Sequence, residues 1–218
     1  MDDAPEDTKL TRTKRLWAEA GRFLTGRHAR PEEDRLPPGQ HLVRDWPVLD
    51  LGVQPEVPLS TWRLDVVGLV ERPLSLNWEQ FGALPQAESR SDIHCVTTWS
   101  RYDNDWRGVR VRDLLDLARP VERASHVMLR SFDGYETNLP LADFAAPDAI
   151  LATHWQGQPL TREHGGPLRA VVPHLYFWKS AKWLGRIELM GADRAGFWER
   201  NGYHMHADPW REQRYSED

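Results

Sequence analysis

One cysteine, Cys95, offers the most reactive side chain in this sequence of 218 residues. It stands in the segment SDIHCVTTWSRYDNDWRGVRVRDLL. A lone cysteine is most often a small buried apolar side chain, but its thiolate is also a nucleophile or a ligand for a soft metal. A chain with a single cysteine forms no internal disulfide, which is typical of a reducing compartment.

A zinc site is one alternative for this thiolate. One cysteine cannot complete a tetrahedral zinc site, so histidines would have to supply the other ligands. The candidates are His94, His154, His164, His204 and His206. Their spacing matches no zinc motif, and the last two stand in a proline-bounded tail segment where exposed histidines are common.

A second segment, HGGPLRAVVPHLYFWKSAKWLGRIEL, combines apolar residues with cations. Charged side chains in such a run usually reach solvent along their own apolar stems. Arg169, however, lies between Leu168 and Ala170 in an expected buried strand, which favours an ionic partner over exposure. Arg169 and the KSAK sequence at 179–182 together indicate a site for a large anionic ligand.

The two segments resemble the sulfite-oxidase family of molybdenum enzymes. HCVTTWS, followed by W-x-G and VRDLL, is similar to the family's cofactor-binding core. The G-x-P-L-R-hydrophobic-V-P run that ends in K-S-x-K is similar to the small bacterial branch, which includes the methionine-sulfoxide reductase catalytic subunit. The resemblance extends from Leu36 to Met190. It implies an α+β fold with mixed sheets, a molybdenum–molybdopterin cofactor and an oxidoreductase activity.

The resemblance also implies roles for single residues. Cys95 would be the protein's thiolate ligand to molybdenum, beside the two dithiolene sulfurs of the pterin. Arg169 would pair with the anionic end of the cofactor, and His164 stands at a polar contact position where many relatives have asparagine. Ser180, Ala181 and Lys182 match a stretch that holds the pterin phosphate through backbone N–H groups and the lysine. A further hydroxyl contact would come from Ser131.

In this family, the cofactor passes an oxygen atom and two electrons between substrate and water. Sulfite-type enzymes collect arginines to hold an oxyanion, and Arg101 follows Cys95 here, but their double arginine is missing. Trp99 and Trp106 would line an apolar pocket, with Tyr102 as a further candidate; packing in the core or rim is the alternative. We therefore predict reduction of a sulfoxide, an N-oxide or a similar small oxo-substrate. The alternatives are sulfite oxidation and a cofactor-free binding module that retains the fold.

Local patterns predict the elements that position these residues. A basic helix is expected over Thr8–Arg27, within an N-terminal unit of residues 1–35, and 31–58 is expected to be an extended surface segment. Residues 36–218 would form the molybdopterin-binding oxidoreductase domain with its C-terminal tail. Strands are predicted over Trp62–Val70, Ser91–Thr97, Ser125–Ser131, Tyr135–Leu139, Leu168–Val172 and Arg186–Met190, and helices over Asn77–Leu84 and Val111–Leu117. The order contains no regular βαβ repeat, which favours a single α+β domain.

Composition excludes several other classes of function. The net charge is −5 and the two signs are interspersed, so no nucleic-acid partner is expected. No apolar run approaches the roughly 20 residues of a membrane span, and no secretory or twin-arginine signal is visible, which predicts a cytoplasmic protein. The chain has no room for the haem or immunoglobulin-like domains of larger sulfite oxidases. Electrons would therefore be exchanged with a separate haem protein or other redox protein.

Overall fold

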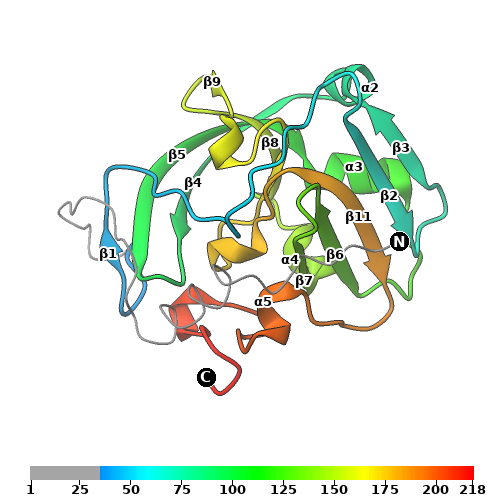
Figure 1. Cartoon of the computed structure of the whole chain (residues 1–218). Helices are drawn as coiled ribbons and strands as arrows, with labels where there is room; N and C mark the ends of the chain where they lie inside the picture. The colour runs from blue at the N-terminus through cyan, green and yellow to red at the C-terminus, as the bar shows by residue number, and fades with distance from the viewer. Residues whose placement is uncertain (1–34) are drawn as a thin grey trace.

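The computed structural model describes residues 35–218. The helix predicted over Thr8–Arg27 lies outside these residues, as does nearly all of the N-terminal unit. Two mixed sheets joined by short helices form an α+β architecture, as the sequence predicted (Figure 1). In this part of the chain, no helix combines the length and apolar character that crossing a membrane would require.

The first sheet has six strands. Its main path consists of β1 (His41–Leu42), β5 (Trp99–Arg110), β8 (Ile150–Trp155) and β10 (Arg169–Val171). Two further strands, β4 (Ala87–His94) and β9 (Gln158–Pro159), pair with β5 and β8 respectively. β1 runs parallel to β5, and the other pairs are antiparallel. This sheet therefore carries both Arg169 and the strands on either side of Cys95.

The second sheet has five strands. In spatial order they are β3 (Leu74–Asn77), β2 (Arg63–Gly68), β11 (Leu184–Met190), β6 (His126–Ser131) and β7 (Glu136–Pro140). β11 lies parallel to β2 and antiparallel to β6. Because β2 and β11 are distant in the sequence, their pairing brings an early strand and a late strand of the chain together in one sheet.

Short helices connect the strands. They are α2 (Trp78–Gly82), α3 (Val111–Ala118), α4 (Leu141–Phe144) and α5 (Phe197–Arg200), together with the 3₁₀ turns η2 (Arg162–His164), η3 (Phe177–Lys179) and η4 (Pro209–Arg211). α2 begins with a capping box, in which the side chains of Asn77 and Gln80 each accept the other's backbone N–H. α3 ends where Arg119 adopts the left-handed conformation.

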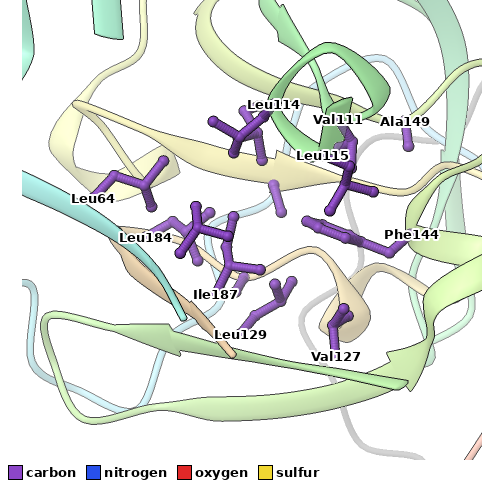
Figure 2. Close-up of a cluster of buried hydrophobic side chains, with 14 of the residues drawn as sticks. Leu64, Val111, Leu114, Leu115, Val127, Leu129, Phe144, Ala149, Leu184 and Ile187 are labelled. Atoms are coloured by element: carbon purple, nitrogen blue, oxygen red, sulfur yellow. The ribbon is translucent and has the colours of Figure 1, made fainter. Parts of the chain in front are cut away.

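The main core lies between α3 and the second sheet (Figure 2). α3 buries Val111, Leu114 and Leu115, which share one face at helical spacing. Opposite them, Leu129 of β6 and Ile187 of β11 are completely buried. A second buried cluster surrounds Cys95 and is rich in aromatic residues, so the site is built beside the main core and separately from it.

The strand predicted over Ser91–Thr97 is displaced in the structure. The observed strand, β4, ends at His94, and residues 95–98 form a turn in which the N–H of Thr98 donates to the carbonyl of Cys95 at 3.0 Å. Thr98 has a φ of 76°, a left-handed conformation that ends the strand. The turn leads into β5, which the sequence patterns did not predict because its charged residues obscure the alternation.

Candidate active site

An open cavity lies between the turn at 95–98, the segment 46–51, the KSAK segment and the C-terminal tail. It encloses about 970 Å³ when the space open to solvent is included. Its lining includes most of the residues that the sequence singled out: Cys95, Trp99, Ser131, His164, Arg169, Ser180, Ala181 and Lys182. Two distant motifs therefore meet at one cavity.

The sulfur of Cys95 lies at the wall of this cavity, and the residue is only 6% exposed. The hydroxyl of Thr97 donates to Sγ at 3.1 Å. Burial raises the pKa of the thiol, whereas the Thr97 hydrogen bonds and the positive charge of Arg214 act in the opposite direction. A bound metal ion would overcome the effect of burial, because coordination deprotonates a thiol.

Arg169 is a buried cation on β10, 2% exposed. Its guanidinium donates to the carbonyls of His164 at 2.8 Å and Ser180 at 2.9 Å, and lies 4.2 Å from the ring centroid of Phe177. Burial lowers the pKa of Arg169 to about 9, and no carboxylate of residues 35–218 offsets this effect. The protein thus orients the cation without neutralising it, which suits an anionic ligand in the cavity.

Unpaired polar atoms in the lining provide a second test of whether the cavity fits an anionic pterin. The hydroxyl of Ser131 and the indole N–H of Trp99 are buried in the cavity lining without a hydrogen-bond partner among the described residues. The backbone N–H of Ala181 likewise makes no hydrogen bond within this part of the chain. Buried polar groups are rarely left unsatisfied. Together with Arg169 and Lys182, these donors fit a pterin that carries a phosphate.

The two lysines of the KSAK segment have different surroundings. Lys182 lines the cavity, where its ammonium donates to the carbonyl of Glu163 at 2.9 Å and lies 4.4 Å from the ring centroid of Trp183. Lys179 is completely buried and forms an ion pair with Glu199 at 2.6 Å. The sequence suggested that both lysines serve the ligand, but only Lys182 lies in the cavity lining.

His164 is held by the protein on both sides of its ring. The ring stacks on Trp46 at 4.1 Å, and its nitrogens lie 3.2 Å from the Trp46 carbonyl and 3.0 Å from the Thr161 hydroxyl. Because a carbonyl only accepts, Nε2 is the donor. Burial lowers the pKa of His164, which favours the neutral ring. Trp46 is itself buried in the lining, so part of the segment predicted to wrap the surface forms the cavity wall.

Three residues predicted for the substrate pocket lie elsewhere. The guanidinium of Arg101 donates to the carbonyl of Arg44 at 3.2 Å and lies 4.7 Å from the Trp155 ring centroid. The ring of Tyr102 packs under Arg35, at 4.3 Å. Trp106 is buried outside the lining, with its indole N–H hydrogen bonded to Ser91. Other contacts within the protein therefore hold these three side chains, and none of the three belongs to the cavity lining.

The zinc alternative is not supported by the described part of the chain. No group of three or more His, Cys, Asp or Glu side chains there is arranged to hold a metal ion. His94 instead contacts the hydroxyl of Ser100 at 2.8 Å, and His206 contacts Asp143 at 3.0 Å.

The structure adds residues that sequence patterns missed. Trp178, Trp198 and Tyr203 line the cavity, and Arg214 donates to the carbonyl of Val96 at 2.9 Å, next to Cys95. Trp198, Tyr203 and Arg214 follow the second motif, in a part of the sequence where no motif was recognised. The high tryptophan count, 11 in the chain, was the available signal, but it did not indicate which rings face the cavity.

Comparisons with known proteins show the family of this chain. The family described as "Oxidoreductase molybdopterin binding domain" matches residues 51–198. The uncharacterized oxidoreductase YuiH of Bacillus subtilis is 50% identical over 188 residues, which are 86% of this chain and 95% of that protein. Mitochondrial sulfite oxidase of Rattus norvegicus is 30% identical, covering 68% of this chain but 33% of the oxidase. The protein-methionine-sulfoxide reductase catalytic subunit MsrP of Campylobacter jejuni is 28% identical, covering 64% of this chain and 52% of MsrP.

A solved structure has a similar fold. The sulfane dehydrogenase SoxCD of Paracoccus pantotrophus aligns with a TM-score of 0.60 at 22% identity, over 68% of this chain and 42% of that chain. The family match includes Cys95, Arg169 and Lys182 and ends before Tyr203 and Arg214. The chain is thus an enzyme with a molybdenum–molybdopterin cofactor, and it belongs to the molybdopterin-binding oxidoreductase family.

Proposed function

We propose that this enzyme reduces a small oxo-substrate, such as a sulfoxide or an N-oxide, at a molybdenum ion bound by Cys95. The observation that carries the proposal is that the Cys95 sulfur shares one cavity with the uncompensated cation of Arg169. A thiolate suits the metal end of the cofactor, and a buried guanidinium suits its anionic end.

Several residues of the cavity lining would hold the cofactor. Arg169, Lys182 and the backbone N–H of Ala181 would bind the anionic groups of the pterin, while Ser131 and Trp99 would donate to its polar atoms. When bound, the cofactor supplies the transfer of an oxygen atom coupled to two electrons. For a sulfoxide, the S–O bond breaks, a thioether leaves, and the oxygen is released as water after taking up two protons and two electrons. A separate redox protein would provide those electrons.

The lining favours a neutral substrate over sulfite. Among the described residues that line the cavity, Arg169 is the single arginine. Its guanidinium is already held by hydrogen bonds to the carbonyls of His164 and Ser180. Arg101, the residue expected to hold an oxyanion, lies outside the cavity lining. A sulfoxide or an N-oxide needs no such cation. Sulfite oxidation remains the alternative activity because sulfite oxidase is among the relatives.

The Cys95→Ser variant tests the proposed ligand. We expect the variant to lose oxidoreductase activity, because a serine hydroxyl is a harder and less acidic ligand than a thiol. X-ray absorption at the molybdenum edge should count one sulfur neighbour fewer than in the wild type. Ile93→Val, a conservative change at a buried position of β4, is the matched control and should keep all sulfur neighbours. An unchanged sulfur count in Cys95→Ser would refute the ligand assignment.

Substrate choice requires a separate assay. The molybdenum-loaded enzyme should reduce sulfoxides with a reduced viologen as electron donor, and should oxidise sulfite much more slowly with ferricyanide as acceptor. Faster turnover of sulfite, lost in Arg101→Met, would overturn the proposed direction and favour a sulfite-oxidase-like activity.

A further inference from the structure

The cavity lining combines two kinds of side chain. Lys182, Asp133 and Ser131 are polar, whereas Trp178, Trp198 and Tyr203 are aromatic. The aromatic residues are linked to Cys95, because Tyr203 and the thiol belong to one buried cluster, against which Trp178 and Trp198 pack. If the polar side chains hold the pterin phosphate, the aromatic ones are left for the substrate.

Trp178 belongs to this aromatic wall and is held by several contacts. It stacks on Tyr176 with centroids 5.5 Å apart and planes 13° apart, and its ring lies at 87° to that of Tyr203, with centroids 5.1 Å apart. Its carbonyl accepts from the hydroxyl of Tyr135 at 2.7 Å. Its indole N–H is directed away from solvent to the buried carboxylate of Glu199, at 2.8 Å. The backbone, the N–H and the side of the ring that faces Tyr176 are therefore held by the protein.

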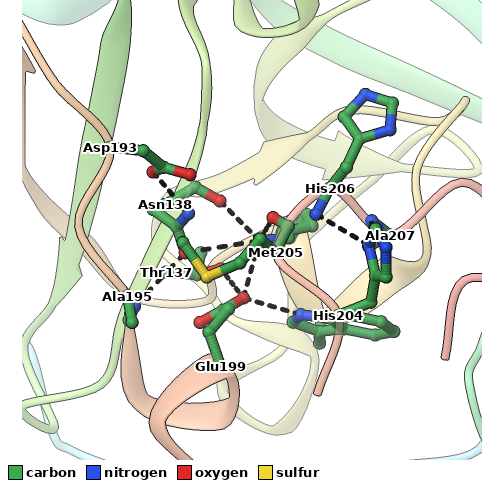
Figure 3. Close-up of polar contacts among 12 residues, drawn as sticks. Thr137, Asn138, Asp193, Ala195, Glu199, His204, Met205, His206 and Ala207 are labelled. Atoms are coloured by element: carbon green, nitrogen blue, oxygen red, sulfur yellow. Dashed lines mark hydrogen bonds and ion pairs between the residues drawn. The ribbon is translucent and has the colours of Figure 1, made fainter. Parts of the chain in front are cut away.

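Glu199 is able to hold this ring because Lys179 fixes it. The ammonium of Lys179 donates to Glu199 Oε1 at 2.6 Å and to the carbonyls of Asn138 and Met205 at 2.7 and 2.6 Å. Figure 3 shows this network between β7 and the tail, with Glu199 below Thr137, whose hydroxyl also donates to it. Both charged side chains have no exposed area.

A buried ion pair is weak evidence for stability, because desolvation of the two charges offsets their attraction. Such a pair is better explained here by what it positions. Glu199 Oε1 accepts hydrogen bonds from Thr137, Trp178 and Lys179, and of these three residues Trp178 is the one that belongs to the cavity lining.

We propose that Trp178 selects substrates with a flat apolar group beside the oxygen atom that they give up, and that the Lys179–Glu199 pair is the positioning device for its ring. This inference rests on the proposed reductase function. A methyl phenyl sulfoxide would place its ring against Trp178 and its S–O group towards Cys95. Dimethyl sulfoxide would gain little from the same wall, since it offers no ring to stack.

The test compares these two sulfoxides with the molybdenum-loaded enzyme and a reduced viologen. Trp178→Ala should raise the KM for methyl phenyl sulfoxide about tenfold, which corresponds to loss of one aromatic contact. The KM for dimethyl sulfoxide and both kcat values should change much less. Trp178→Phe should restore most of the discrimination. The control Trp210→Ala removes an exposed tryptophan of the same tail and should change neither KM.

Two double variants isolate the positioning role. Lys179→Met with Glu199→Gln removes both charges and keeps a side-chain oxygen for the Trp178 indole, so selectivity should be retained. Lys179→Met with Glu199→Leu removes that oxygen as well, and should reproduce the KM pattern of Trp178→Ala. Equal selectivity in the two double variants would overturn the positioning role.

A binding measurement distinguishes failure of this inference from failure of the proposed function. Calorimetry with methyl phenyl sulfone and dimethyl sulfone, which are not reduced, should give the same Trp178-dependent preference. If sulfoxides are reduced but neither KM nor affinity depends on Trp178, the selectivity inference is wrong. If no sulfoxide is reduced while phenyl sulfone binding still depends on Trp178, the reaction is wrong and the aromatic subsite stands.

Discussion

Single residues at the site are held in energetically costly states that a ligand would relieve. Arg169 is a buried cation surrounded by carbonyls and rings, and Ser131 is a buried hydroxyl without a partner in the described chain. Proteins rarely leave such groups uncompensated. In a family of cofactor-binding enzymes, the economical explanation is that the pterin completes their interactions.

The variant Arg169→Met should therefore release the cofactor. Removing one partner of a buried, hydrogen-bonded charge costs about 2 to 5 kcal/mol of binding free energy. We expect the pterin content of the purified protein, measured by fluorescence after acid release, to fall to less than about a tenth of the wild-type value. Arg130→Met, which changes an ion pair on the second sheet, is the control. Wild-type pterin content in Arg169→Met would exclude the anion-binding role.

His94, next to the proposed ligand, predicts a pH dependence of stability. Burial lowers its pKa from 6.5 to about 4. Between these two pKa values, the unfolded chain binds a proton that the folded protein does not. The free energy of unfolding therefore decreases as the pH falls, by about 3 kcal/mol once the pH is below both values. His94→Gln should lose much of this decrease when urea unfolding is compared at about pH 7 and about pH 4.5. His126→Gln, at the second sheet, serves as the control. If the free energy of unfolding of His94→Gln falls between the two pH values as much as that of the wild type, the effect does not come from His94.

At the scale of elements, β5 and β8 approach each other closely where residues 107–110 of β5 pair with β8. A Cβ at Gly108 would lie 2.0 Å from the carbonyl oxygen of Leu151. The register of this pair shifts at Gly108, and a glycine is what permits the contact.

Gly108→Ala should accordingly destabilise the protein by at least about 3 kcal/mol, because two backbones must separate. Urea unfolding measures the difference. Gly82→Ala offers a matched control: the new methyl would meet nothing within 4 Å, in a helix where alanine is favoured by about 1 kcal/mol. If Gly108→Ala unfolds at the wild-type midpoint, position 108 tolerates a side chain and the β5–β8 contact is not as close as the structure has it.

The same elements explain how far the sequence predicted the structure. α2 and α3 were predictable because a capping box and an apolar stripe are local signals, and β2, β6, β7 and β11 because their apolar runs are continuous or alternate. β5 was not, since charged residues and a glycine interrupt it, and β8 was not, since its six residues show no regular alternation of apolar and polar side chains. At the site, the two motifs indicated Cys95 and Arg169, whereas Trp178 and Arg214 depend on contacts between distant segments that no local pattern records.

At the scale of the whole molecule, the tail beyond the family match completes the site. Arg214 is the clearest link: it donates to the carbonyls of Val96 and Pro38 and lies over the ring of Tyr176. Its guanidinium thus joins three parts of the chain around the Cys95 turn.

Arg214→Met should lower the free energy of unfolding by about 1 to 3 kcal/mol, because two charged hydrogen bonds to partly buried carbonyls are lost. Denaturant titration measures the change, and Arg211→Met, an exposed neighbour, should leave it unaltered. Equal stability of the two variants would mean that the tail is not held to the turn through this side chain.

The position of the tail has a consequence for cofactor binding. The tail contributes Tyr203 to the cavity lining, and Arg214 holds the tail to the Cys95 turn. A ligand that binds only the folded protein stabilises it, so we expect occupation of the cavity and docking of the tail to reinforce one another.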